Sequence, residues 1–541
     1  MPRPRVYWLT LSLIILLSLL GAALIVYATY WGPWGWSDSV GYIEVAHNIQ
    51  VGRGPVQIKG SGNISLITLH PPFYSYLLSG IALSGMDLVS AARWLDVALF
   101  AAFLLFLGLS FYALTSQPLL ALAVCLYFVT SPVIILDFSS LLSEPLFFTL
   151  AIPGIILSVF YLQKKNRWFL IPSALLLGLA LTTRFTGITF IATVVLVLLL
   201  YQKNDLKRWI VDAALFSALS AGPFLIWMVY LRSTGGSFVA FSNPFVNWFQ
   251  TLYKFGGSFI DVIWNWLPNG SASAVMMTRY KIIILLPAIL ILAALIRVGI
   301  RRKRRLKLHG DHLKPSVQLG IAFLVFGLVY FAFIFLTTFI LVYTKPTIDD
   351  RILSPILISF FIGFVIFFSY LLENRGPNRL SQWLPFLSVL VLVSFNIIPM
   401  LKNVQLLHDQ GVGYTSAQWQ GSSVIPVMRQ LPPNIPIVSS NIDAIMFFTF
   451  RPARRLPELE NNAQVKVYQT FGNDLSNAAE AVFREKGAAL VIFNSDYHLF
   501  NDLYGKNTSA RLEAMTKGLY KYYEGPDGAI FFYQKPIQPW P

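Results

Sequence analysis

The first residue that could do chemistry is Asp38, a carboxylate in the first polar stretch after an apolar opening. It lies eight residues beyond Tyr30, where an uncharged run of 25 residues that starts at Val6 ends. Ionisable groups near a membrane boundary are costly unless they are paired or functional. We therefore expect Asp38 to be a carboxylate that works at the water boundary, and the loop 31–88 to hold it.

Other charged residues lie at the edges of later apolar runs. They are Asp137, Glu144, Arg184 and the group Asp349-Asp350-Arg351. Such groups can pair with one another and fix helix packing, as Glu144 could with Arg184, or they can take part in chemistry. His47 and His70 have no companions at metal-ligand spacing, so we expect no metal ligation by either. No cofactor is expected, although a divalent metal is left open.

The composition is that of a polytopic α-helical membrane protein. The chain has 541 residues, of which 56% are hydrophobic and 12% charged, with a mean hydropathy of +0.62. Soluble proteins carry roughly a quarter charged residues. The net charge is +16, but residues 401–541 contain 13 basic and 12 acidic side chains, so 15 of the 16 excess charges precede them. Basic residues in the short loops of membrane proteins follow the positive-inside rule, so we expect a lipid bilayer and no nucleic acid as partner.

A bilayer core takes roughly 20 apolar residues as a helix. We expect about eleven spans, two of them a pair of short helices within 168–201 that turn at Arg184. The others are 6–30, 89–114, 118–136, 143–162, 209–231, 280–298, 316–343, 352–372 and 380–400. The runs 39–49 and 72–85 are too short to cross and are predicted to be interfacial helices, and the second outer loop, 232–279, carries the tryptophans of an interfacial segment.

The basic run Arg301–Arg305 marks the cytoplasmic side. It places the N-terminus inside and residues after 400 outside the plasma (inner) membrane. Residues 1–400 are then the membrane module and 401–541 a small extracytoplasmic α/β domain. Its expected strands are 435–440, 488–493 and 529–533, with helices at 443–450 and 476–486. It has no glycine-rich phosphate loop, no paired metal ligands and no nucleophile elbow, so we expect it to cover the site or to bind the acceptor.

Six short motifs in order resemble the GT-C membrane glycosyltransferases, in the branch of the protein O-mannosyltransferases and aminoarabinose transferases. The resemblance covers about residues 1–400. The motifs are Asp38 with Tyr42 and Ala46, Gly52-Arg53-Gly54, His70-Pro71-Pro72-Phe73-Tyr74, Ser143-Glu144-Pro145-Leu146-Phe147, Leu181-Thr182-Thr183-Arg184-Phe185-Thr186-Gly187, and Asp350-Arg351-Ile352-Leu353-Ser354-Pro355.

The resemblance implies transfer of a sugar, with inversion, from a polyprenyl-phosphate donor to a lipid, glycan or protein acceptor on the outer side. Asp38 is implied as the general base, and Tyr42, His70, Tyr74 and Asp350 as donor or acceptor contacts. Relatives often have Asp-Glu where this chain has Asp38-Ser39, which leaves a second acidic role open for Asp137 or Glu144. Their Tyr-Pro-Pro is His70-Pro71-Pro72 here.

A sugar that leaves with a phosphate needs cations at the phosphate oxygens, where negative charge builds up. The arginine fork suits this task, which nominates Arg351 and Arg184, with Lys59 as a third candidate. Two alternatives stay open: a transporter or lipid flippase with the same outer charges, and a catalytically inactive member of the family. Transporters commonly have two halves with matching broken helices, whereas only 168–201 is expected to be broken here.

Overall fold

The structure is a computed structural model that describes residues 4–58, 64–66, 70–234, 248–266, 314–340, 348–373, 379–456, 487–504 and 508–536. Contacts divide the chain into two compact units, each made of two separate segments. Unit 1 consists of 1–28 and 94–406, and unit 2 of 29–93 and 407–541. Unit 2 therefore combines the first outer loop with the C-terminal segment, which the sequence analysis assigns to different domains.

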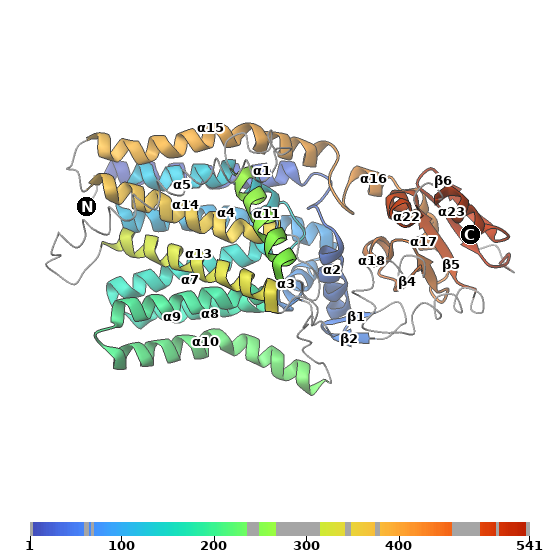
Figure 1. The fold of residues 1–541 in the computed structure, drawn as a ribbon, viewed down its shortest axis with the longest axis horizontal. Coiled ribbons are helices and arrows are strands. Elements are labelled where there is room, and N and C mark those ends of the chain that lie inside the picture. The colour runs from blue at the N-terminus through green and yellow to red at the C-terminus, as the bar shows by residue number, and fades with distance from the viewer. Residues whose placement is uncertain are drawn as a thin grey trace. The chain divides into compact units, whose positions relative to one another are not determined.

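Unit 1 is a bundle of long helices (Figure 1). Helices α4 and α15 each have a few residues in unit 2. The helices are α1 (Pro4–Ala28), α4 (Leu88–Thr115), α5 (Pro118–Thr130), α6 (Pro132–Phe138), α7 (Glu144–Lys164), α8 (Arg167–Thr183), α9 (Ile188–Gln202), α10 (Leu206–Ser233), α11 (Trp248–Asn265), α13 (Pro315–Ile340), α14 (Asp350–Glu373) and α15 (Arg379–Asp409).

Eight helices in the described part of the chain are long and apolar enough to cross a membrane, and the pair α5–α6, bent by 67°, makes a possible ninth span. Helix α8, with 17 residues, falls just below that length. The expected span 280–298 lies outside the described residues. Each of the other expected spans overlaps a described helix, which confirms the polytopic helical class.

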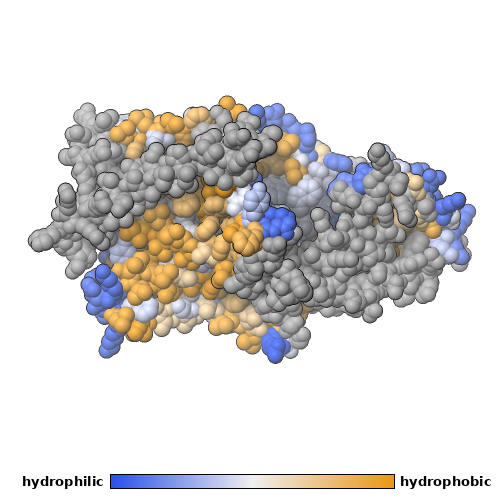
Figure 2. Space-filling model, in the orientation of Figure 1, coloured by the Kyte–Doolittle hydropathy of each residue, from blue (hydrophilic) through white to orange (hydrophobic). Residues whose placement is uncertain are grey.

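The outer surface of this bundle is apolar, as a lipid environment requires. Figure 2 shows hydrophobic side chains gathered over the face of the helices. On α10, for example, Ile226 is 73% exposed and Val229 69%. Exposed apolar patches of this kind are rare on soluble monomers, whereas lipid tails solvate them without cost.

Arg184 separates two short helices, as predicted. Helix α8 ends at Thr183, and Arg184 has an extended backbone (φ −147°, ψ 138°). A turn of 3₁₀-helix, η1 (Phe185–Gly187), then leads into α9. The extended backbone breaks the helical hydrogen-bond ladder, so the Arg184 side chain lies at the end of a helix rather than along its length.

Unit 2 contains the two short helices predicted for the first loop and a five-stranded sheet. The sheet order is β4-β3-β5-β7-β6; β3 pairs in parallel with β4 and β5, and β7 is antiparallel to β5 and β6. The predicted strands at 435–440, 488–493 and 529–533 and the helix at 443–450 are confirmed, while the predicted helix at 476–486 lies outside the described residues.

The main elements of unit 2 are α2 (Ser37–Gln50), β1 (Val56–Ile58), β2 (Ile64–Leu66), α3 (Phe73–Ala82), α17 (Val424–Gln430), β3 (Ile437–Ser439), α18 (Ile442–Thr449), β4 (Ala453–Arg455), β5 (Ala489–Phe493), α22 (Tyr497–Tyr504), α23 (Thr508–Thr516), β6 (Tyr520–Gly525) and β7 (Gly528–Phe532).

The two segments of unit 2 are joined by backbone and ring contacts. The amide of Tyr414 donates to the carbonyl of Gly35 at 3.1 Å. The neighbouring Gly413 has φ +69°, and a Cβ there would lie 2.0 Å from the Gly35 oxygen, so this position excludes a side chain. The His47 ring, on α2, stacks on Phe450 just after α18, with centroids 4.1 Å apart.

Candidate functional site

Three helix ends in unit 1 bring a carboxylate and two guanidinium groups together. Oε1 of Glu144 lies 2.8 Å from Nη1 of Arg184 and 3.4 Å from Nε of Arg351. The Glu144 side chain is 2% exposed, whereas the two arginine side chains are 24% and 27% exposed. A buried carboxylate thus holds two guanidinium groups that a ligand can still reach.

Glu144 is the first residue of α7, the helix that follows α6 in the chain. Pro145, at the start of the helix, has a fixed φ suited to the first turn and lacks the amide that would have no partner there. A carboxylate at a helix N-terminus is favoured by the helix dipole. The local sequence therefore places a negative charge at this helix end before any tertiary contact forms.

Arg184 owes its position to the break between α8 and η1. Thr183 donates its hydroxyl back to the carbonyl of Leu179 at 2.8 Å. A Cβ at Gly187 would lie 2.6 Å from backbone atoms of Leu181, so η1 packs against α8 more closely than any other residue would permit. The guanidinium also donates from Nη1 to the hydroxyl of Ser143 at 3.1 Å.

Arg351 lies in the first turn of α14, directly after two aspartates that fix this helix end. Asp349 accepts a hydrogen bond from the Ile352 amide at 2.8 Å, as an N-capping carboxylate does. Asp350 accepts one from Nε1 of Trp266, at the end of α11, also at 2.8 Å. From α13, the Tyr330 hydroxyl donates to the Ile352 carbonyl at 2.9 Å. Asp350, expected as a donor or acceptor contact, is thus placed here as an anchor between α14 and α11.

Asp137, near the end of α6, completes the cluster. It is 3% exposed and lies beside the side chain of Ser354, within electrostatic reach of Glu144 and Arg351. Its Oδ2 has no hydrogen-bond partner among the residues that the structure describes. Of the residues expected in unit 1, the structure therefore brings together Asp137, Glu144, Arg184 and Arg351. Lys59 lies outside the described residues.

In unit 2, the candidates from the first loop also come together. Oδ1 of Asp38, in the first turn of α2, lies 3.8 Å from Nε2 of His70. The His70 ring lies beside Tyr42, with centroids 4.8 Å apart, and Tyr42 contacts Tyr74 edge-on at 5.0 Å. Both tyrosines are buried, while Asp38 is 41% exposed. The buried rings of Tyr42 and Tyr74 therefore support the accessible Asp38 carboxylate and His70 imidazole by packing.

Two further carboxylates of unit 2 were not predicted from the sequence: Asp443, which lies near Asp38, and Glu44, which lies near Asp443. Burial raises the pKa of Asp443, on α18, and among its charged neighbours Arg455 lowers it while Asp38 raises it. Burial raises the pKa of Glu44 to about 7, although its carboxylate accepts a 2.6 Å hydrogen bond from the Ile58 amide. No motif marks Asp443, because its position depends on packing between α18 and α2. In the described part of the chain, no group of three or more histidine, cysteine or acidic residues could hold a metal ion.

Comparison with solved structures shows the fold. ArnT from Cupriavidus metallidurans bound to undecaprenyl phosphate aligns with a TM-score of 0.52 at 14% identity, over 96% of this chain and 98% of that one. The archaeal oligosaccharyltransferase AglB from Archaeoglobus fulgidus, in complex with an inhibitory peptide and a dolichol-phosphate, aligns with a TM-score of 0.51 at 13% identity, over 98% of this chain and 75% of that one.

No protein-family model and no curated protein matches the sequence. The likeness therefore lies in the structure, over nearly the whole chain, including the C-terminal segment for which the sequence motifs predict no resemblance. The chain has the fold of the GT-C membrane glycosyltransferases, as its motifs predict.

Proposed function

We propose that this protein is a glycosyltransferase that moves one sugar from a polyprenyl-phosphate carrier to a lipid, glycan or protein acceptor, with inversion, on the outer face of the inner membrane. Support comes from the GT-C fold, which it shares with a protein solved with undecaprenyl phosphate and one solved with a dolichol-phosphate. The proposal needs a phosphate-binding group and a base, and the described residues supply a candidate for each.

The observation that carries the proposal is the pair Arg184 and Arg351 on one buried carboxylate. Charge builds on the phosphate oxygens as the sugar leaves, and preorganised cations stabilise it without a proton donor. Guanidinium groups bind phosphate through parallel hydrogen bonds. Glu144 orients both arginines from the buried side, and their side chains stay 24% and 27% exposed, which a phosphate can contact. In this proposal Glu144 positions the arginines, and Asp137 is the remaining candidate for a second acidic role.

Asp38 is proposed as the general base that takes the proton of the attacking acceptor hydroxyl. It is the accessible carboxylate of the α2 start, and its neighbour His70 can hold it in place through one ring nitrogen. Tyr42 and Tyr74 support this pair from below and are proposed to shape the pocket for donor or acceptor.

Binding of undecaprenyl phosphate to the purified full-length protein, followed by native mass spectrometry, tests the phosphate site. Wild type should bind it, and Arg184→Gln/Arg351→Gln should not. The matched control Lys203→Gln/Lys314→Gln removes two exposed cations that lie apart from the arginine pair, and should bind like wild type. Equal binding by all three proteins would contradict a phosphate site at the arginine pair.

Transfer itself is tested with polyprenyl phosphates that carry a labelled hexose or pentose, incubated with the protein and membranes as the acceptor source. Label should reach an acceptor with wild type and not with Arg184→Gln/Arg351→Gln. Carrier binding without transfer from any donor would favour the inactive-member alternative, and movement of the carrier across vesicles would favour the flippase alternative.

A further inference from the structure

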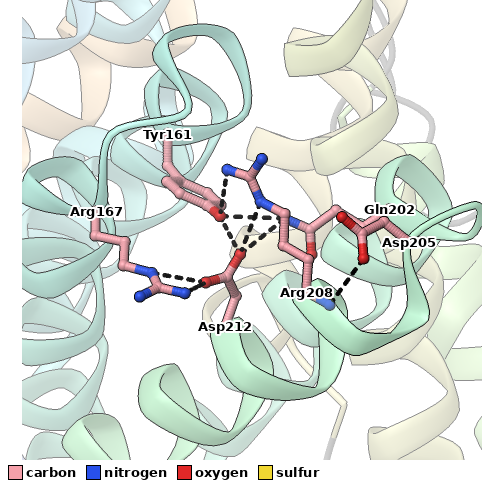
Figure 3. Close-up of polar contacts among 6 residues, drawn as sticks. All are labelled: Tyr161, Arg167, Gln202, Asp205, Arg208 and Asp212. Atoms are coloured by element: carbon pink, nitrogen blue, oxygen red, sulfur yellow. Dashed lines mark hydrogen bonds and ion pairs between the residues drawn. The ribbon is translucent and has the colours of Figure 1, made fainter.

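A second charged cluster (Figure 3) lies at the other ends of α7 and α8, the helices that carry Glu144 and Arg184. Helix α7 runs for 21 residues from Glu144 to Lys164, which corresponds to about 30 Å, the thickness of a bilayer core. The second cluster therefore lies at the opposite membrane boundary from Glu144. Its polar contacts join Tyr161, Arg167, Gln202, Arg208 and Asp212.

Asp212, on α10, is the centre of this cluster and is completely buried. Its Oδ1 accepts from Arg167 at 2.9 Å, and its Oδ2 accepts from Gln202 at 3.0 Å and from Arg208 at 3.5 Å. The Tyr161 hydroxyl donates to the same carboxylate. The buried Asp212 carboxylate thus holds two guanidinium groups in place, while the Arg167 side chain remains 52% exposed and the Arg208 side chain 34% exposed.

A cavity of about 650 Å³ opens over these two arginines. Its lining consists of Lys165, Asn166, Arg167, Asp205, Lys207, Arg208 and Val211. Four of the seven are cations and one is an acid, so together with Asp212 beneath them the net charge is 4 − 2 = +2.

The Asp205 and Asn166 side chains of this lining each accept a hydrogen bond from a helix N-terminus. Asp205 caps α10 by accepting from the Arg208 amide at 3.1 Å, and Asn166 caps α8 by accepting from the Trp168 amide at 3.0 Å. The cavity therefore offers donors and positive charge, and the N-terminal ends of α8 and α10 add the positive poles of their helix dipoles.

The surface beside the cavity is apolar. Trp168 is 78% exposed, and Leu206 and Ile210, on the first turns of α10, are 55% and 53% exposed. Tryptophan collects at the boundary between water and lipid, and exposed aliphatic side chains on a membrane-spanning helix face lipid tails. A ligand with a phosphate in the cavity and acyl chains along α10 would satisfy both surfaces.

We infer that this cavity binds the phosphate headgroup of an anionic phospholipid, at the membrane boundary opposite the Arg184–Arg351 pair. The buried Asp212 distinguishes it from scattered surface lysines, because a guanidinium already held in place loses less conformational entropy when it binds. The inference does not depend on the proposed glycosyl transfer.

Native mass spectrometry of the full-length protein in a neutral detergent tests it with four probes: dioleoylphosphatidylglycerol, dioleoylphosphatidylcholine, undecaprenyl phosphate and inorganic phosphate. Phosphatidylglycerol should bind at least about tenfold more tightly than phosphatidylcholine. Near a membrane, each basic residue contributes roughly 1 kcal/mol toward an anionic lipid, so Arg167→Gln/Arg208→Gln should weaken phosphatidylglycerol binding about 30-fold.

The control is Arg232→Gln/Lys254→Gln, which removes the same charge from two exposed residues outside the cavity lining, Arg232 at the opposite end of α10 and Lys254 on α11, and should change phosphatidylglycerol binding less than about threefold. Undecaprenyl phosphate binding should survive Arg167→Gln/Arg208→Gln and be lost in Arg184→Gln/Arg351→Gln. This separates failure of the cavity from failure of the proposed function.

Equal binding of the two phospholipids, or equal weakening by the two paired variants, would overturn the inference. Displacement of phosphatidylglycerol by inorganic phosphate at similar concentration would show that the ligand is a free phosphate. If Arg167→Gln/Arg208→Gln does not fold, Lys165→Gln/Lys207→Gln removes two exposed cations of the same lining and leaves the Asp212 network intact. That variant should also lose selectivity for phosphatidylglycerol, and unchanged selectivity would overturn the inference.

Discussion

Nε of Arg351 lies 3.4 Å from Oε1 of Glu144, the atom that also pairs with Arg184. Glu144 opens α7 and Arg351 lies in the first turn of α14, so the contact joins two helix ends that are far apart in the chain. The two guanidinium groups repel each other, and the Glu144 carboxylate between them offsets that repulsion from the buried side. A phosphate on their exposed edges would add negative charge on the opposite side.

The first prediction concerns Arg351. Arg351→Ala should weaken undecaprenyl phosphate binding on the order of 10- to 100-fold, because it removes a charged hydrogen-bonding partner. Arg351→Lys should recover little, since a point charge replaces a two-pronged contact. Isothermal titration with the purified protein measures both. Arg232→Ala, which removes an exposed arginine at the end of α10, serves as control, and unchanged affinity in Arg351→Ala would reduce Arg351 to a packing role.

The second prediction concerns the break that positions Arg184. In Gly187→Ala the new methyl group would lie 2.6 Å from Leu181 backbone atoms, which cannot move as a side chain can. We expect a loss of about 1–3 kcal/mol in stability together with weaker undecaprenyl phosphate binding. Gly222→Ala meets no atom within 4 Å and should be neutral or slightly stabilising. Thermal melts in detergent compare the two, and identical melting temperatures would show that η1 can shift without cost.

The third prediction concerns Asp38 as general base. Asp38→Asn keeps the size and polarity of the side chain but cannot accept the acceptor proton, so transfer should fall on the order of 100- to 10,000-fold. Undecaprenyl phosphate binding should change far less, because the carboxylate acts on the acceptor. Asp38→Glu should recover little, because the longer side chain displaces the oxygens by about an ångström.

The control for Asp38 is Asp87→Asn, the same substitution at an exposed aspartate. Asp87 Oδ1 accepts from the amides of Val89 and Ser90 at the start of α4, and an asparagine can accept the same bonds. Near-normal transfer by a folded Asp38→Asn protein would exclude Asp38 as the base and direct attention to Asp137.

The fourth prediction is a pH dependence centred on Glu44. Burial, with a smaller contribution from Asp443, raises its pKa from 4.5 to about 7. Between these values the folded state binds a proton that the unfolded chain releases, so stability falls as the pH rises from about 4.5 through 7 and then levels off. The cost at high pH is at most about 3 kcal/mol.

Glu44→Gln abolishes this ionisation and keeps an oxygen for the Ile58 amide. The variant should therefore melt at a higher temperature than wild type at pH 8 and at a similar one at pH 5. Glu513→Gln, which makes the same change at an exposed glutamate, should leave the wild-type pH profile unchanged. A Glu44→Gln profile parallel to wild type would contradict the assignment.

The fifth prediction concerns the orientation of the helix bundle, that is, which end of α10 faces the cytoplasm and which faces the outside. Helix α10 has exposed ends at Lys203, just before it, and Ser233, its last residue. In a Cys125→Ala background, a cysteine at 233 should react with an impermeant maleimide in intact cells, and one at 203 only after permeabilisation. A cysteine at the exposed Gln430, in unit 2, should react like 233. The reverse pattern would invert the proposed orientation.

Much of unit 1 was predictable because the bilayer imposes simple local constraints. Long uncharged runs that cross a bilayer must form helices of a fixed length. A helix could not continue through Arg184 unless the charge of that residue had a partner. Charged groups in apolar surroundings are energetically costly unless they are paired or functional. This cost marks Glu144, Arg184 and Arg351 as residues with a pairing or functional role. The short helices of the first loop and the strands of the C-terminal segment also follow local patterns.

Only the tertiary structure decides which charges meet. Charge and position suggest the pair Glu144–Arg184, but the third partner, Arg351, depends on the packing of α14 beside α7. The Asp212 cluster joins α7, α8, α9 and α10, and in sequence its arginines are indistinguishable from ordinary inside anchors. Asp443 reaches the neighbourhood of Asp38 only because α18 packs on α2. The length of an apolar run and the place where a helix breaks depend on neighbouring residues, so the sequence alone determined them. Ion pairs between distant helix ends depend on how those helices pack, and no local sequence pattern encodes that packing.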